Sequence, residues 1–237
     1  MKRLASVLAL AAAGCATVSP DPSAHGEFFS HLRSLCGKAF EGRIASPPVP
    51  ADASFAGKKL VMHVRDCSVT EIRVPFHVGE DRSRTWVLTR QAGGLRLKHD
   101  HRHRDGSEDR LTQYGGDAIA AGSSDRQEFP ADAQSRALFM RESLSASVPN
   151  VWAVEIKPGR VFAYELRRPG RFFRVEFDLT RPVAPPPPPW GSDRPLSARR
   201  SSQARFPGSQ LARAGRGGRA TRRSADPRSP RLPGRRR

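Results

Sequence analysis

The amino-acid sequence predicts a mainly β protein: an antiparallel β-barrel or a two-sheet sandwich, with an N-terminal helix and one inserted helix. Apolar and polar residues alternate strictly in at least six segments, so each strand has one face to bury. Short turn signals such as Pro158–Gly159 and Pro169–Gly170 join successive segments, which favours antiparallel pairing. About six to nine such strands close most easily into a small barrel or pack as two sheets.

The elements follow in chain order. Residues 26–36 place apolar side chains at helical spacing and predict a short amphipathic helix. Strands are predicted in the alternating segments 60–64, 72–78, 85–89, 95–97, 152–156, 162–166 and 173–179, and also in Phe40–Ile44 and Leu111–Tyr114. Alternation places His77 on an outward, solvated face. Charged residues on the polar faces of the last three strands are expected to form cross-strand ion pairs, and Asp125–Glu128 a charged surface.

The strand pattern breaks between Pro130 and Leu144. Ala133, Ala137, Met140 and Leu144 form an apolar stripe at helical spacing. One helix is therefore predicted to interrupt the sheet.

Composition divides the chain into five regions. They are a signal peptide or lipobox at 1–15, a tether at 16–24, the antiparallel β domain at 25–181, a proline-rich linker at 182–191 and an arginine-rich tail at 192–237. Pro185–Pro189 predicts a stiff polyproline segment that does not fold back on the domain. The tail has one aromatic residue and is expected to be disordered.

The formal net charge of +18 is concentrated in the tail, which carries +12 from 14 arginines and two acidic residues. Such a tail could bind RNA, DNA or anionic lipid through counterion release. Read-through of a GC-rich gene past its natural end would produce the same residues without function. Nucleic acid is not an expected partner, because aromatic residues for base stacking are nearly absent and an exported tail rarely meets it.

The N-terminus predicts export. A short basic start precedes the apolar stretch from Leu4 to Ala13, which is too short to span a bilayer. The stretch ends in Ala12–Ala13–Gly14–Cys15, which resembles the lipobox of bacterial lipoproteins. That resemblance implies a lipid on Cys15 that holds the protein to a membrane; ordinary signal cleavage near the same alanines is the alternative. Either way the expected location is outside the cytoplasm: lipid-anchored in the cell envelope, periplasmic or secreted.

The other two cysteines, Cys36 and Cys67, can pair in an oxidising compartment. The loop closed by this disulfide would stabilise the fold by roughly 3–4 kcal/mol in the chain-entropy model. Two buried free thiols are the alternative.

Three closely spaced histidines are the main candidates for a metal site. If the strand beginning at Leu95 continues, His99, His101 and His103 share one face, and two imidazoles at this spacing can chelate one metal ion. A hairpin at Asp105–Gly106 would bring Glu108 back beside His103 as a further ligand or a base.

The spacing from His101 and His103 through Glu108 to Gly115 resembles the first metal-binding motif of cupins. Cupins are double-sheet barrels that bind iron, manganese or other metals, so the resemblance implies a divalent metal. No histidine follows His103, and His99 would have to replace the missing ligand.

Two functions follow. The first is a non-enzymatic, exported barrel that holds a small apolar ligand between Phe, Trp and Tyr side chains, with no cofactor and no catalytic residue. A helix followed by a closed antiparallel sheet resembles the calycin architecture of lipocalins. The alternative is a metal-dependent, cupin-like enzyme that uses His99, His101, His103 and Glu108. The sequence does not predict an oligomeric state.

Overall fold

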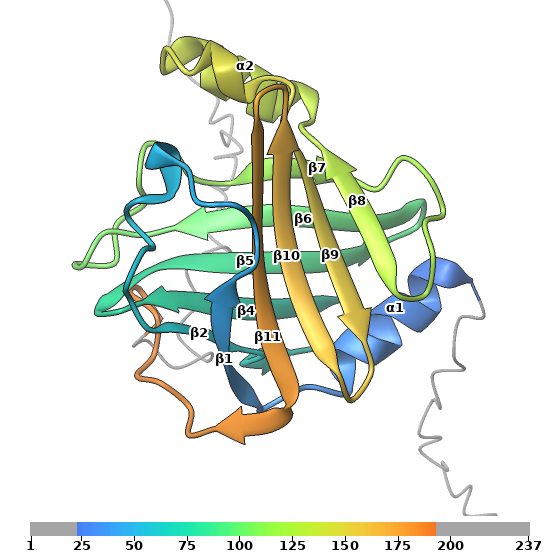
Figure 1. Cartoon of the computed structure of the whole chain (residues 1–237). Helices are drawn as coiled ribbons and strands as arrows, with labels where there is room; N and C mark the ends of the chain where they lie inside the picture. Colours follow the sequence, from blue (N-terminus) through green and yellow to red (C-terminus); the bar gives the residue numbers. More distant parts are fainter. Residues whose placement is uncertain (1–22, 193–237) are drawn as a thin grey trace, which may run out of the picture. The chain divides into compact units, whose positions relative to one another are not determined.

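The computed structural model describes residues 23–192, and it confirms a mainly β fold: a nearly closed antiparallel barrel with two helices (Figure 1). The helices are α1 (Ala24–Arg33) and α2 (Ala133–Arg141), with 3-10 turns η1 (Pro50–Asp52) and η2 (Ser145–Ser147). The strands are β1 (Ala39–Ile44), β2 (Leu60–His63), β3 (Asp66–Cys67), β4 (Glu71–Val78), β5 (Asp81–Gln91), β6 (Gly94–His101), β7 (Tyr114–Asp117), β8 (Arg126–Pro130), β9 (Val151–Lys157), β10 (Val161–Arg168) and β11 (Arg171–Val183).

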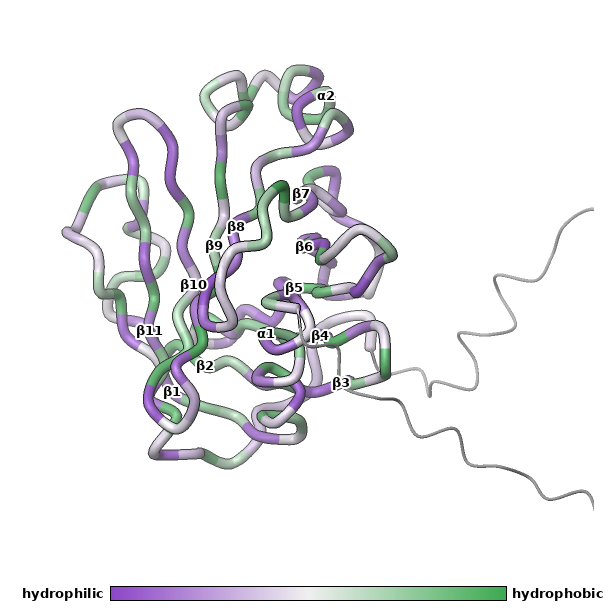
Figure 2. The backbone as a smooth tube through the Cα atoms, turned by 90° about the vertical axis from the view of Figure 1, so that its right-hand side faces the viewer, coloured by the Kyte–Doolittle hydropathy of each residue, from purple (hydrophilic) through white to green (hydrophobic). Residues whose placement is uncertain are grey.

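All strands belong to one sheet, in the order β7-β6-β5-β4-β2-β1-β11-β10-β9-β8, with β3 paired to β4 off this path. Strands β4 to β6 cross strands β9 to β11 steeply, which encloses an interior between them (Figure 1). Figure 2 shows hydrophobic and hydrophilic residues alternating along the chain of β9 to β11. The inward residues of that alternation, such as Val154, Phe162 and Val175, are fully buried. The predicted register is therefore the one that buries the apolar face.

The barrel nearly closes where its terminal strands β7 and β8 meet. The amide of Asp132 donates a hydrogen bond to the carbonyl of Gly115 at 2.9 Å, and the Ser135 hydroxyl bonds both the amide and the carbonyl of Gly115. A side chain at Gly116 would overlap the carbonyl oxygen of Pro130. The two glycines thus allow the close backbone approach that joins the edges of the sheet.

Helix α1 closes one end of the barrel. Ser23 caps it by accepting a hydrogen bond from the Gly26 amide, and Phe28, Phe29 and Leu32 are buried in the core. His25 bonds the carbonyl of Ala120 on the loop between β7 and β8. The predicted N-terminal helix is confirmed, and it leaves the opposite end of the barrel open.

The inserted helix is also confirmed, but its buried face differs from the predicted stripe. Ser135, Leu138 and Phe139 are buried, whereas Ala133 and Ala137 are exposed and Met140 is 61% exposed. The hydrogen bonds of Ser135 to Gly115 hold that side of the helix against the sheet, so a polar residue takes an inward position.

The strand predictions need three corrections. The strand predicted at Leu111–Tyr114 begins only at Tyr114, as β7. The segment Asp125–Glu128, expected as a charged surface, contains the first part of β8, and its Gln127 is fully buried. His77 is 3% exposed rather than solvated, because β4 is buried on both faces over its second half.

Cross-strand ion pairs cover the outer face of β8 to β11 as predicted. Arg126 bonds Glu165 at 2.6 Å, and Arg174 contacts both Glu165 and Glu176. These pairs suffice as an explanation of the charged residues on that face.

Cys36 and Cys67 form the predicted disulfide, which ties the segment after α1 to β3. The link secures the closed end of the barrel.

The chain continues past the predicted end of the domain. Strand β11 extends to Val183, and the linker then returns along the domain: the Trp190 amide bonds the carbonyl of Arg82, and the Arg82 side chain bonds the carbonyl of Pro188. The prediction that the prolines keep this segment away was wrong. A stiff extended segment can still lie along a surface once the chain has turned before it.

Cys15, the export signal, most of the tether and the tail fall outside the described residues. Between residues 23 and 192, neither helix has the length and apolar character needed to cross a membrane.

Candidate functional site

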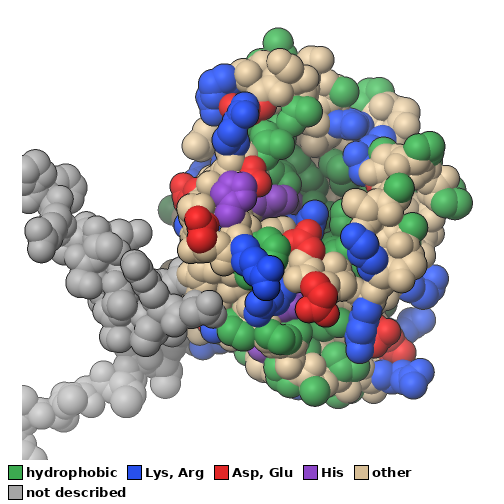
Figure 3. All heavy atoms as spheres, turned by 90° about the vertical axis from the view of Figure 1, so that its left-hand side faces the viewer, with side chains coloured by type: hydrophobic (Ala, Val, Ile, Leu, Met, Phe, Trp, Pro, Cys, Tyr) green, Lys and Arg blue, Asp and Glu red, His purple; other side chains and the backbone are tan. Residues whose placement is uncertain are grey.

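The open end of the barrel holds a cavity of about 410 Å³. Figure 3 shows the hollow, with hydrophobic side chains inside it and histidine and basic side chains around it. Eight of the lining side chains are Phe, Trp or Tyr, contributed by the strands, by Phe139 of α2 and by the loop that carries Phe55. The volume lies within the range of ordinary small-molecule sites, roughly 300–1,000 Å³.

Stacked rings from opposite walls form the floor of this cavity. Trp86 on β5 stacks on Tyr164 of β10 at 4.3 Å between ring centroids, and on Phe76 of β4 at 4.8 Å. Strands β5 and β10 are not neighbours in the sheet, so the stack spans the barrel interior. These stacked rings present a flat apolar surface. Because packing already orders them, a ligand that binds there loses little affinity to the ordering of side chains.

His99 lies beside this stack and is 2% exposed. Its Nδ1 lies 3.1 Å from the carbonyl oxygen of Tyr114, and its Nε2 lies 2.8 Å from the hydroxyl of Tyr164. Because a carbonyl only accepts, Nδ1 carries the proton and Nε2 accepts from the hydroxyl. Burial above all, and then the charge of His101, lowers the pKa of His99 to about 3. The imidazole is therefore neutral at physiological pH.

His101 lies at the end of the same strand and lines the same cavity. Its Nε2 lies 3.2 Å from the hydroxyl of Tyr114, and its amide donates to the hydroxyl of Thr112. Burial, followed by the charge of Arg84, lowers the pKa of His101 to about 4. Burial also raises the pKa of Tyr114 well above its usual value. His99, His101 and Tyr114 form a neutral polar strip beside the aromatic side chains of the cavity.

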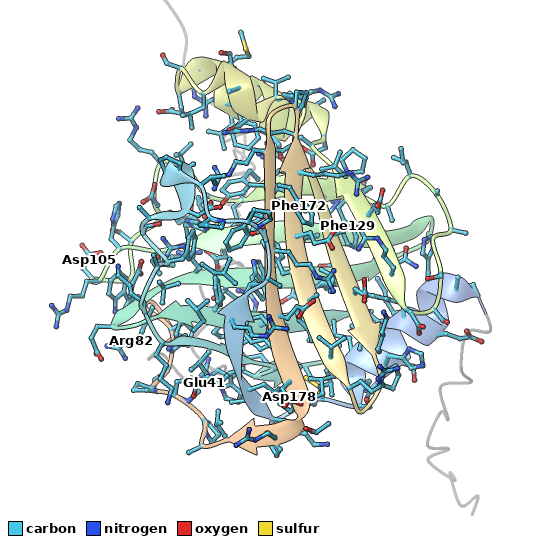
Figure 4. All side chains as sticks on the ribbon, viewed as in Figure 1. Glu41, Arg82, Asp105, Phe129, Phe172 and Asp178 are labelled. Carbon is cyan, nitrogen blue, oxygen red and sulfur yellow. A yellow bond between two sulfur atoms is a disulfide. The ribbon has the colours of Figure 1, made fainter. Side chains whose placement is uncertain are left out.

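The structure does not bring His103 and Glu108 to this strip. Strand β6 ends at His101, and the loop carrying Asp105 points away from the barrel (Figure 4). Glu108 accepts a hydrogen bond from Arg102 at 2.9 Å, and Nδ1 of His103 lies 4.0 Å from Oδ2 of Asp109. The hairpin at Asp105–Gly106 does fold Glu108 back, but onto Arg102.

The four predicted metal ligands therefore do not converge. Both ring nitrogens of His99 have hydrogen-bond partners, and between residues 23 and 192 no three His, Cys, Asp or Glu side chains are placed to hold one ion. The metal site stays a prediction.

Three arginines also line the cavity, and sequence reasoning missed them. Arg84 pairs with Asp81 and lies over the ring of Phe55 at 5.6 Å from its centroid, while Arg171 pairs with the buried Asp52. The side chain of Arg168 bonds the hydroxyl of Ser147 at 2.7 Å. The turn Pro169–Gly170 between Arg168 and Arg171 was a usable signal, because it places both arginines at one end of the barrel.

Comparison with known proteins returned no match: no family model fits the chain, and no curated protein or solved structure matches it.

Proposed function

We propose that this protein is an exported binding protein that holds a small, largely apolar ligand in the open end of its barrel. The observation that carries the proposal is the aromatic-lined cavity of about 410 Å³ opposite the end closed by α1. Ligand sites in proteins combine such apolar walls with a few placed polar groups. Here the neutral strip of His99, His101 and Tyr114 provides those groups.

Export is supported by two features of the chain. Residues 1–15 have the pattern of a lipoprotein signal, and the Cys36–Cys67 disulfide is the kind of cross-link that persists in oxidising compartments. We propose a lipid on Cys15 as the membrane anchor, with a free periplasmic or secreted form as the outcome of ordinary signal cleavage.

The neutral dye phenylnaphthylamine tests the binding proposal, because its fluorescence rises when it leaves water for an apolar site. Wild-type protein should bind it saturably with one site per chain. Leu144→Trp adds bulk to a residue that lines the cavity and should weaken binding at least about tenfold. Met140→Trp makes a comparable change on the exposed side of α2 and should leave binding unchanged.

Thermal unfolding of both variants controls for loss of the fold. Equal binding by wild type and Leu144→Trp, with the latter folded, would contradict the proposed site. The intact mass of the protein isolated from its producing cell tests export: a chain starting at Cys15 with acyl groups is expected, and an unprocessed Met1 start would overturn this part.

A further inference from the structure

We infer that the ligand is an amphiphilic anion, whose apolar body fills the barrel and whose oxyanion group, a carboxylate, sulfonate or phosphate, binds Arg168 and Arg171 at the rim. The inference rests on the proposed function and adds the chemical class of the ligand.

The first observation is the placement of the two arginines. Arg168 and Arg171 are the pair that closes the β10–β11 hairpin, directly opposite each other on either side of Pro169–Gly170. Like charges opposite each other destabilise a sheet. An anion between the two guanidinium groups would turn that repulsion into attraction.

The second observation is that part of their hydrogen-bonding capacity is unused. Asp52 neutralises Arg171, yet the buried Nε of Arg171 has no hydrogen-bond partner within residues 23–192. Arg168 has the Ser147 hydroxyl but no carboxylate partner in the same part of the chain. Burial, and then the charge of Arg171, lowers the pKa of Arg168. The rim therefore carries one positive charge, that of Arg168, without a carboxylate partner among residues 23–192, and the Nε of Arg171 behind it lacks an acceptor.

The third observation is the order of polarity along the hairpin. Two pairs further along the hairpin, Leu166 lies opposite Phe173, and both line the cavity. Because the strand period is two, this pair shares the inward face with Arg168 and Arg171. A ligand on this wall meets charge at the rim and apolar surface below it.

The other charged groups of the lining do not offset this charge. Arg84 already pairs with Asp81. Asp109 is the one acidic residue that lines the cavity, and it lies on the other wall, 4.0 Å from His103 and bonded to the amide of Leu111.

Two dyes that differ only in a sulfonate group provide the test: anilinonaphthalene sulfonate and the neutral phenylnaphthylamine. The wild-type protein should bind the sulfonate at least about tenfold more tightly. Arg168→Gln should remove most of that preference and leave binding of the neutral dye within about twofold. Arg168→Lys should retain most of it, because the charge remains.

Arg167→Gln is the matched control. Arg167 is the adjacent residue on the same strand, but it points outward to Glu128. It should leave both affinities unchanged. Added salt should weaken binding of the sulfonate and not of the neutral dye, which tests the charge in the wild-type protein alone.

The failures are distinguishable. If the neutral dye binds and the sulfonate binds no more tightly, the anion inference is overturned and the proposed function stands. If neither dye binds, both are overturned. Equal losses in Arg168→Gln and Arg167→Gln would also overturn the inference, because general surface charge would then explain the preference.

Discussion

The hydroxyl of Tyr164 lies 2.8 Å from Nε2 of His99, and this hydrogen bond joins opposite walls of the barrel. His99 is on β6 and Tyr164 is on β10, strands separated by five others in the order of the sheet. The bond sets the tautomer of a buried imidazole and orients Tyr164 against Trp86. The floor of the cavity is thus held by a polar contact between two aromatic layers.

Removing that hydroxyl should be costly. Tyr164→Phe leaves the buried Nε2 of His99 without a donor, so we expect a loss of about 1–3 kcal/mol in the free energy of unfolding. Tyr114→Phe removes the partner of His101, which is partly exposed and can bond water instead, so its cost should be smaller. Urea unfolding measures both. Equal costs for the two variants would contradict the assignment of a special role to the His99 contact.

The close contact between β7 and β8 predicts that two glycine substitutions differ in their effect on stability. Gly116→Ala would place a methyl group on the carbonyl oxygen of Pro130, forcing β7 away from β8. We expect a loss of about 1–3 kcal/mol in the free energy of unfolding. Gly93→Ala is the control, since no atom lies within 4 Å of the added group, and it should change stability by no more than about 0.5 kcal/mol. A neutral result at Gly116 would mean that the barrel edges do not meet.

The strand interior and the barrel closure show what the sequence could and could not predict about the fold. Alternation predicted the strands with inward Trp86, Phe162 and Val175, because one-sided burial leaves a period of two. It missed the closure at Gly116, because contact between β7 and β8 is a property of the folded backbone and leaves no periodic signal. The apolar stripe on α2 misled for the same reason: a buried polar bond at Ser135 decided which face turned inward.

His77 predicts a pH dependence of stability. Burial first, and then the charges of Arg82 and His63, lower its pKa to about 4, while Asp81 acts in the opposite direction. An unfolded chain binds the proton near pH 6.5, so the contribution of His77 is fully present above that pH and is lost as pH falls toward 4. The slope for one histidine is about 1.4 kcal/mol per pH unit.

Urea unfolding of wild type and His77→Gln between pH 6.5 and 4.5 isolates this contribution. The variant should lose stability less steeply by about that slope, because the other histidines titrate in both proteins. Parallel curves would show that His77 is solvated.

Metal analysis addresses the alternative function. The scattered positions of His103 and Glu108 predict well below one equivalent of any divalent metal in protein purified without a histidine tag. Combined substitution of His101 and His103 by alanine should not change that content. A full equivalent in the wild type that disappears in the double variant would establish the metal-dependent interpretation instead.

The sequence predicted part of the candidate site and missed the rest, as it did for the fold. The period of two correctly placed His99 and His101 on one inward face, and it failed at His103 because the strand ends first. The Pro169–Gly170 turn places Arg168 and Arg171 at one end of the barrel, but the sequence does not show that this end is the open one. Only the folded hairpin shows that Arg168 and Arg171 face each other over the cavity.

The three indole N–H resonances test directly whether a ligand enters the barrel. Trp86 and Trp152 line the cavity, whereas Trp190 does not and lies on the returning linker. Titration with phenylnaphthylamine, followed by NMR on ¹⁵N-labelled protein, should shift the signals of Trp86 and Trp152 in proportion to occupancy and leave Trp190 in place. If the dye binds while Trp86 and Trp152 stay unshifted, or if Trp190 alone responds, the ligand does not enter the barrel and the proposed binding site is wrong.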